Sequence, residues 1–459
     1  MKKILILCSV AVLSTLSGCE SRLEVAPTQT IDQTTALNAS KDVEAALIGA
    51  YDGLQGNNAN GEPLAGGFQY TSEILAAVPT DVRFGGTFAN LQEIYRKEMT
   101  TINTTAELLW LRSYVVINRV NNVLANLDKV TEAKKVRVEG EARFIRGTLY
   151  FELARLYGKQ WGDGNNAANP AVPIILTPTT AVTDANKVPR STVEQVYAQA
   201  LDDLTKAEAA LPVANSFYAT KSAAAAILSR LYLQQGNFAL ARDAANRVIA
   251  SGRFRLVTPF AAAFNSKLNN GGANPVEYVF AIQVNDQDGF NGMNTFFGTT
   301  VGSIPGTAGR GDMRVQPAHI ALYEAGDARG TFFIRPSANT FTFKFLDRFG
   351  NVPVVRLSEM LLTRAEANFR LGTAVGATPA ADVNAVRTRA GLGNLATVTL
   401  AAILRERRLE LAFEGHAIHD IKRNRGTVGA LPFNSPRLVM PVPQREIDVF
   451  PTLGQNEGY

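Results

Sequence analysis

Two histidines near the C-terminal end of the sequence lie among carboxylates. His416 and His419 are three residues apart, so on a helix they point to the same side. Glu414 and Asp420 flank them, and imidazole and carboxylate groups are common metal ligands. A metal pair is therefore one interpretation of this segment.

The charged residues just before the histidines favour another interpretation. Arg405 to Glu410 alternate in charge at the spacing of helix ion pairs, for example Arg407 with Glu410. The whole chain contains only three histidines, so imidazole ligands are scarce. We therefore predict a structural charge network here and no metal site.

Common enzyme and cofactor motifs are either absent from this chain or match it only in part. No Gly-x-Ser-x-Gly, Walker A or His-Glu-x-x-His motif occurs. Gly391 to Ala396 fits a Gly-x-Gly-x-x-Ala pattern, but it follows a predicted helix, whereas a dinucleotide loop follows a strand. Asn285 to Gly289 resembles the start of a calcium loop without its distal glutamate. These motifs nominate no catalytic or cofactor site, so we predict that the protein is not an enzyme and uses no cofactor.

Aromatic side chains in loops are the remaining candidates for ligand contact, because a ring face can stack on the C–H face of a sugar. Trp110 falls inside an amphipathic helical pattern, so we expect it in the core. The loop 158–164 and the glycine-rich segment 288–311 also contain aromatic residues, and loops often carry function. We nominate these as ligand contacts: Trp161, Phe290, Phe296 and Phe297.

Composition sets limits on the class of protein. The 459 residues are 46% hydrophobic and 19% charged, and the mean hydropathy is near zero. These values exclude global disorder and a polytopic membrane protein. The chain has 46 Lys and Arg against 41 Asp and Glu, which gives a formal charge of +5. This excess of positive charge is too small to indicate a nucleic-acid-binding surface.

The first residues predict export and a lipid anchor. Lys2 and Lys3 precede a 13-residue, mostly apolar stretch from Ile4 to Leu16, which has the length of a signal peptide. Ser17 and Gly18 then lead into Cys19, which matches the lipobox of bacterial lipoproteins. We predict cleavage before Cys19, diacylglycerol on its sulfur, a signal peptide over 1–18 and a tether over 19–38.

The remaining residues, 39–459, are expected to form one mainly α-helical domain. Apolar residues at helical spacing predict helices with the following bounds: Ser40 to Leu54, Thr105 to Leu127, Glu132 to Tyr157, Arg356 to Leu371, Ala381 to Arg389 and Leu400 to about Lys422. A capping box at Ser191–Glu194 predicts a helix ending at Leu211. Lys221 to Ser251 has the spacing of a tetratricopeptide-type helix-turn-helix.

An insertion interrupts this helical pattern. Val276 to Val284 and Phe341 to Phe345 alternate in the manner of strands, and 288–311 reads as a flexible aromatic loop. We therefore predict a helical scaffold over about 40–265 and 351–428, with a small irregular insertion of strands and loops over about 270–350.

Several segments in order resemble one family, the SusD/RagB outer-membrane nutrient-binding lipoproteins. The resembling segments are Glu141 to Gly147, Val355 to Ala367, Val383 to Leu392, Arg405 to Arg423, Pro441 to Pro443 and Gln455 to Tyr459. The third of these reads VNAVRTRAGL, and the fourth reads RERRLELAFEGHAIHDIKR. Within the fourth, Ala417 and His419 stand where the family usually has an arginine and an aromatic residue.

The resemblance implies a fold and a role. The fold would be a SusD-like scaffold of four tetratricopeptide-like helix pairs with a less regular ligand-facing part. The protein would lie on the outer membrane, facing the exterior, and cap a SusC-like TonB-dependent transporter. Its cargo would be an oligosaccharide or, as in the RagB branch, a peptide. An adaptor without its own ligand is a further alternative.

Overall fold

The computed structural model describes residues 37–56, 63–180, 183–287 and 289–459. The predicted signal peptide, the predicted lipidation site Cys19 and nearly all of the predicted tether lie outside these residues. Within the described ranges, no helix combines the length and the apolar character needed to cross a membrane.

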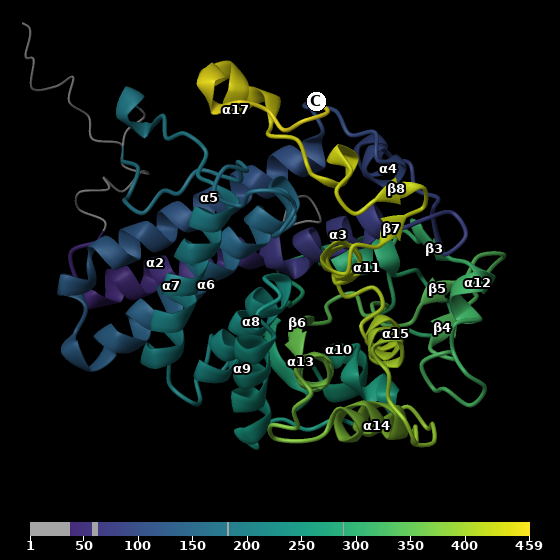
Figure 1. Cartoon of the computed structure of the whole chain (residues 1–459). Coiled ribbons are helices and arrows are strands. Elements are labelled where there is room, and N and C mark those ends of the chain that lie inside the picture. Colours follow the sequence, from purple (N-terminus) through teal and green to yellow (C-terminus); the bar gives the residue numbers. More distant parts are fainter. Residues whose placement is uncertain (1–36, 57–62, 181–182, 288) are drawn as a thin grey trace, which may run out of the picture.

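The fold is mainly helical, as the sequence predicts (Figure 1). The longer helices are α2 (Ser40–Gln55), α3 (Phe68–Ala76), α4 (Ala89–Arg96), α5 (Thr104–Ala125), α6 (Glu132–Tyr157), α7 (Val193–Ala210), α8 (Lys221–Gln234), α9 (Phe238–Ala250), α13 (Leu357–Leu371), α14 (Pro379–Arg389) and α15 (Leu400–Glu410). Shorter ones are α10 (Ser266–Asn270), α11 (Gly292–Phe297), α12 (Pro317–Ile320), α16 (Ala417–Arg423) and α17 (Gln444–Val449). The strands are β1 (Val82–Phe84), β2 (Tyr278–Ile282), β3 (Met313–Val315), β4 (Phe333–Ile334), β5 (Phe341–Thr342), β6 (Val352–Arg356), β7 (Thr427–Val428) and β8 (Leu431–Pro432).

Neighbouring helices pack in a continuous stack, which is the tetratricopeptide-like scaffold. Helix α5 packs on α2 and α6, α7 on α6 and α8, and α9 on α8 and α13. Helix α13 in turn packs on α14 and α15. The contact between α9 and α13 joins helices that are far apart in the sequence, so the intervening insertion is looped out of the stack (Figure 1).

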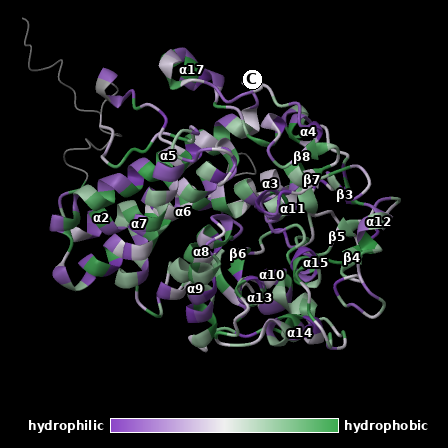
Figure 2. Cartoon of the chain, viewed as in Figure 1, coloured by the Kyte–Doolittle hydropathy of each residue, from purple (hydrophilic) through white to green (hydrophobic). Residues whose placement is uncertain are grey.

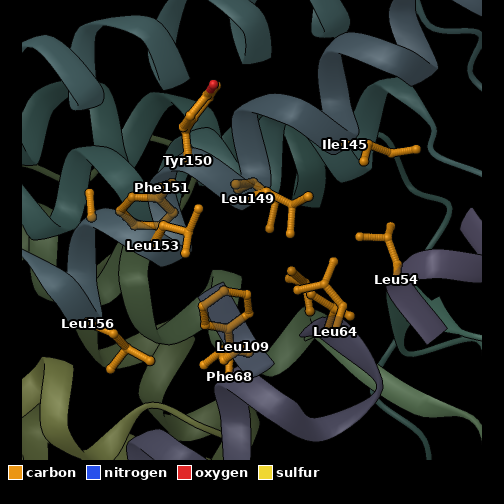
Figure 3. Close-up of a cluster of buried hydrophobic side chains, with 14 of the residues drawn as sticks. Leu54, Leu64, Phe68, Leu109, Ile145, Leu149, Tyr150, Phe151, Leu153 and Leu156 are labelled. Atoms are coloured by element: carbon orange, nitrogen blue, oxygen red, sulfur yellow. The ribbon is translucent and has the colours of Figure 1, made fainter. Parts of the chain in front are cut away.

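The core of the scaffold is formed where several helices converge. Figure 3 shows the cluster, to which α2, α3, α5 and α6 contribute these buried side chains: Leu54, Phe68, Leu109, Leu149 and Leu153. Full burial of each such side chain stabilises the fold by about 1.5–3 kcal/mol. The outer helices α2 and α7 carry both hydrophilic and hydrophobic residues along their length, as amphipathic helices do (Figure 2).

The start of α7 differs by one residue from the sequence prediction. Thr192, not Ser191, is the N-cap: its side chain accepts a hydrogen bond from the backbone N–H of Gln195. The Gln195 side chain accepts one from the backbone N–H of Thr192 in return. Gln195 therefore completes the capping box instead of Glu194, because either residue type can fill the third helical position.

The predicted helix from Leu400 to Lys422 is wrong in one respect, because the chain breaks it into α15 and α16. Phe413 and Gly415 between them have φ angles of 68° and 88°, which a helix does not allow. A Cβ on Gly415 would lie 2.7 Å from the Cα of Gln69, so α3 approaches the break closely. The contact with α3 thus fixes a turn that the helical periodicity does not show.

Short antiparallel strand pairs lie in or beside the insertion: β4 pairs with β5 inside it, whereas β3 pairs with β1 and β2 pairs with β6, and both of these partner strands lie outside it in the sequence. The strand predicted near Val276–Val284 is confirmed as β2, but all five of its residues are buried on both faces. The pattern at Phe341–Phe345 yields only the two-residue β5. The predicted loop 288–311 includes a short helix, α11, which the Asn291 side chain caps by accepting a hydrogen bond from the Asn294 N–H.

Candidate functional site

The charged C-terminal motifs form a buried network rather than a ligand site. At its centre, the Arg356 guanidinium bonds to the carboxylates of Glu277, Glu410 and Glu414. Lys344 contributes a second cation 2.7 Å from Glu414. Burial raises the pKa of the Glu414 carboxyl, but the charges of Arg356 and Lys344 outweigh burial and leave that pKa below its ordinary value. The network holds together β6, α15, the turn after α15 and the residue before β2.

The structural charge network predicted from the sequence is therefore present, with different partners. Arg407 does not pair with Glu410: its Nε lies 2.8 Å from Asp420 Oδ2 of α16. Glu410 is instead bonded to Arg356 and Arg389. The reason is the break after α15, which turns α16 back so that Asp420 faces Arg407.

His416 and His419 are both buried in this region. His419 Nε2 lies 3.0 Å from the Ser72 hydroxyl, and His416 Nε2 lies 3.8 Å from a carboxylate oxygen of Glu359. Burial, reinforced by nearby arginines such as Arg230 and Arg155, holds both pKa values well below the ordinary value. Both rings are therefore neutral at neutral pH. In the described parts of the chain, no three His, Cys, Asp or Glu side chains are gathered as metal ligands would be.

A carboxylate that the sequence did not single out lies at the start of α16. Glu73 Oε1 accepts hydrogen bonds from the backbone N–H groups of Gly415, His416 and Ala417, at 2.7, 2.9 and 3.3 Å. Burial raises the pKa of Glu73 to about 7, although these hydrogen bonds act in the opposite direction. No local pattern marks Glu73, because its partners lie more than 300 residues away.

The nominated pair Phe296 and Phe297 lies inside the protein. The two residues are 3% and 1% exposed, respectively, at the end of α11. Phe296 packs edge-on against Tyr70 with ring centres 4.7 Å apart, and Phe297 packs against Phe345 and Phe413. Neither ring is exposed at the surface, because α11 turns both of them toward the core, where Phe297 borders an internal cavity.

The nominated Phe290 lies at the other end of α11 and is only half-buried. Its ring stacks on Phe349 with centres 6.1 Å apart and planes 19° apart. The exposed Arg348 places its guanidinium 4.1 Å from the Phe290 ring centre and 5.1 Å from that of Phe349. A ring pair and a guanidinium thus share one solvent-accessible position.

A second ring and guanidinium pair, which sequence reasoning missed, lies beside the far end of α11. Phe88 is 37% exposed and packs edge-on against Phe296. The guanidinium of Arg310 lies 4.4 Å from the Phe88 ring centre and donates a hydrogen bond to the Thr87 hydroxyl. The sequence signal that could have nominated Phe88 is an aromatic residue directly after the loop-like residues Gly85, Gly86 and Thr87. We call these residues the α11 rim: Phe88, Phe290, Arg310, Arg348 and Phe349.

The two tryptophans pack against aromatic residues of the helical scaffold. Trp161 is partly buried and packs against Tyr197 of α7 with ring centres 5.0 Å apart. Trp110 is 2% exposed, so its predicted burial is confirmed. It nevertheless borders a cavity of about 530 Å³ together with Tyr114 and Phe450. The nominated aromatic residues therefore do not form one site.

The known proteins that this chain resembles are SusD-like. Residues 23–233 match a family described as starch-binding associating with outer membrane, and residues 347–435 match the SusD family. SusD-like protein P2 of Formosa agariphila is 25% identical over 474 aligned positions, covering 90% of this chain and 89% of that protein.

Solved structures agree over nearly the same extent. A SusD superfamily protein from Bacteroides thetaiotaomicron aligns with a TM-score of 0.77 at 25% identity, covering 91% of this chain and 99% of that one. A SusD-like carbohydrate binding protein from Bacteroides vulgatus aligns with a TM-score of 0.72 at 25% identity, covering 85% and 84%.

Proposed function

Because this chain belongs to the SusD/RagB family, we propose that it binds nutrient oligosaccharides at a cell surface. It then delivers them to a SusC-like TonB-dependent transporter in the outer membrane. The protein acts by binding and performs no covalent chemistry. The family model described as starch-binding and outer-membrane associated supports this proposal.

For this chain, the proposal rests on the residues of the α11 rim. Its rings are accessible at the surface, and each is accompanied by a guanidinium: Arg310 at Phe88 and Arg348 at Phe290. In this conformation each guanidinium covers a face of its ring, so a sugar would displace it to stack its apolar C–H face there, and the displaced N–H groups would donate to the sugar hydroxyls. Of the nominated ligand contacts, Phe290 has this arrangement. For Trp161, Phe296 and Phe297, ligand contact stays a prediction.

Attachment to the membrane belongs to the same proposal. Residues 1–18 act as the signal peptide, the Cys19 sulfur carries the lipid, and residues 19–38 tether the domain 39–459. Within that domain, 40–265 and 351–428 are the helical scaffold, and 270–350 is the ligand-facing insertion that contains most of the α11 rim.

The test is a binding screen with protein that begins at Glu20. Affinity gels and calorimetry would compare a panel of polysaccharides with a panel of short peptides. We expect one glycan to retard the protein, and Phe290→Ala and Phe88→Ala each to weaken that binding at least tenfold. Phe217→Ala is the matched control, because Phe217 is a 59% exposed phenylalanine on the scaffold. Binding of a peptide and no glycan would overturn the proposed cargo, and equal losses in all three variants would overturn the proposed site.

A further inference from the structure

An internal cavity lies beside α11 and plays no part in the proposed function. It has a volume of about 410 Å³ and is bounded by α3, α11, α15, α16 and β7, which meet in the same part of the molecule in Figure 1. Its lining is mostly apolar and includes the buried side chains of Phe297, Met313 and Phe413. Cavities of this size and character are typical of small-molecule sites, in which a few polar groups set the specificity.

The charged side chains in the cavity wall are paired with one another, with one exception. Asp420 pairs with Arg407, and Asp81 pairs with Arg408. Glu73 is the exception, because within the described chain no Lys, Arg or His nitrogen lies within 4.0 Å of its carboxylate oxygens. The wall therefore carries one negative charge without a cation in contact.

The two oxygens of the Glu73 carboxylate differ in their surroundings. Oε1 accepts the three backbone hydrogen bonds from the start of α16, whereas Oε2 accepts none from the described residues. Glu73 is 8% exposed, and Oε2 stays open to water, unlike the buried atoms of the described chain that lack a partner. Because Glu73 lines the cavity, Oε2 is available to a molecule inside it.

A buried carboxylate without a cation in contact is costly, and a cation that reaches it offsets part of this cost. We propose that this cavity is a second ligand site for a small organic cation, a primary amine on an apolar body. The ammonium group pairs with Glu73 Oε2, and the apolar body lies against Ala76, Met313 and Val428. A neutral compound of the same shape has only the second of these interactions.

Hexylamine and hexanol are suitable probes, because they share an alkyl chain and only the amine is positively charged at pH 8. Calorimetry and ligand-observed NMR with the folded protein at pH 8 should show hexylamine binding at least tenfold more tightly than hexanol. Glu73→Gln keeps an oxygen for the three N–H groups but removes the charge, so the two affinities should come within about twofold of each other. Glu107→Gln, which removes a 30% exposed carboxylate from α5, is the matched control and should leave the preference for the amine unchanged.

The pH dependence of hexylamine binding provides a second readout. Burial raises the pKa of Glu73 to about 7, so the carboxylate is mostly protonated at pH 6 and mostly charged at pH 8. The affinity for hexylamine should therefore fall by about tenfold between pH 8 and pH 6. Glu73→Gln should abolish this change, although it keeps the other charged and titratable groups that line the cavity or act on Glu73: Asp81, His319, Lys344, Arg407, His416 and Asp420.

Two results would overturn the inference. Absence of hexylamine binding at pH 8 would mean that the cavity takes no organic cation, and an undiminished preference for the amine in Glu73→Gln would place the cation elsewhere. If Glu73→Gln does not fold, Ala76→Phe decides, because a ring that fills the cavity from α3 should abolish binding of both probes. Binding of oligosaccharide should be unchanged in both variants, so failure at this cavity is distinguishable from failure at the α11 rim.

Discussion

At the scale of single residues, Glu73 shows how burial and hydrogen bonding oppose each other. Three backbone N–H groups donate to Oε1, yet burial dominates and raises the pKa to about 7. A carboxyl whose pKa rises on folding holds a proton more tightly in the folded state than in the unfolded state. Between its ordinary pKa of 4.5 and about 7, it therefore makes the fold less stable as pH rises.

Glu73→Gln should remove this pH dependence while keeping an oxygen that accepts the same hydrogen bonds. We expect the variant and the unmodified protein to have similar free energies of unfolding near pH 5. Near pH 8 the variant should be more stable by up to about 3 kcal/mol. Urea unfolding at the two pH values measures this difference. A variant that is less stable by the same amount at both values would show that the negative charge supports the start of α16.

The buried ion network gives a second prediction at this scale. Arg356→Met would leave Glu277, Glu410 and Glu414 without their shared partner in a buried position. Removing one member of a buried pair typically costs about 3–5 kcal/mol, and here three carboxylates lose a partner. We expect at least that loss in the free energy of unfolding, measured by urea denaturation.

The matched control for this substitution is Arg445→Met. The Arg445 side chain is 59% exposed and lies 3.6 Å from Glu107, so its ion pair is screened by water. Its loss should change stability by no more than about 0.5 kcal/mol. Similar small losses in both variants would mean that the network around Arg356 does not hold the insertion to the scaffold.

At the scale of elements, the break between α15 and α16 decides which residues meet. It directs α16 back toward α15 so that Asp420 reaches Arg407, and it presents three free N–H groups to Glu73. The break depends on Gly415, which combines a φ angle of 88° with close contact to the backbone of Gln69. Both features exclude a side chain at this position.

A comparison of Gly415→Ala with Gly372→Ala separates the cost of the positive φ angle from the cost of the contact with Gln69. Gly372, which ends α13, has a φ angle of 64°, and nothing lies within 4 Å of a Cβ added there. Gly372→Ala should therefore cost only the strain of the backbone, about 1 kcal/mol. Gly415→Ala should cost about 1–3 kcal/mol more, because the methyl group also meets Gln69. Equal losses of unfolding free energy in the two variants would show that α3 yields to the methyl group.

In the whole molecule, the helical stack and the insertion pack in different ways. The α9–α13 contact closes the stack across the insertion, so the segment that we propose to face the ligand emerges from between packed helices (Figure 1). The stack buries the apolar faces of its helices against one another, whereas the insertion leaves the stacked rings of Phe290 and Phe349 half-buried.

The proposed lipid anchor is a prediction about the whole protein. Cys19→Ala should prevent lipid attachment, so the protein should move from the membrane fraction to the soluble fraction of the cell envelope. Mass spectrometry of the unmodified protein should find the acyl chains on Cys19, and protease treatment of intact cells should degrade it. Recovery of Cys19→Ala in the membrane fraction would contradict anchoring through this residue.

Several helices could be predicted from the sequence because their signals are local. The apolar spacing in Glu132–Tyr157 and the turn in Lys221–Ser251 predict α6, α8 and α9 closely, because spacing and caps act within a few residues. The resemblance of separate segments also identified the family. The loop-like glycines around Phe290 nominated it as a ligand contact, which stays a prediction; its ring is half-buried, and its guanidinium partner Arg348 is not visible in any local pattern.

Which side chains meet depends on long-range packing, which no local pattern reveals. Asp81 and His319 are 238 positions apart, and Glu73 and Gly415 are 342 positions apart, so no periodicity relates them. The same reason explains why Glu277 is buried, although strand alternation predicts it at the surface. Arg356 and Arg389 approach it only after β6 and α14 have packed, and a buried charge is stable only beside such partners.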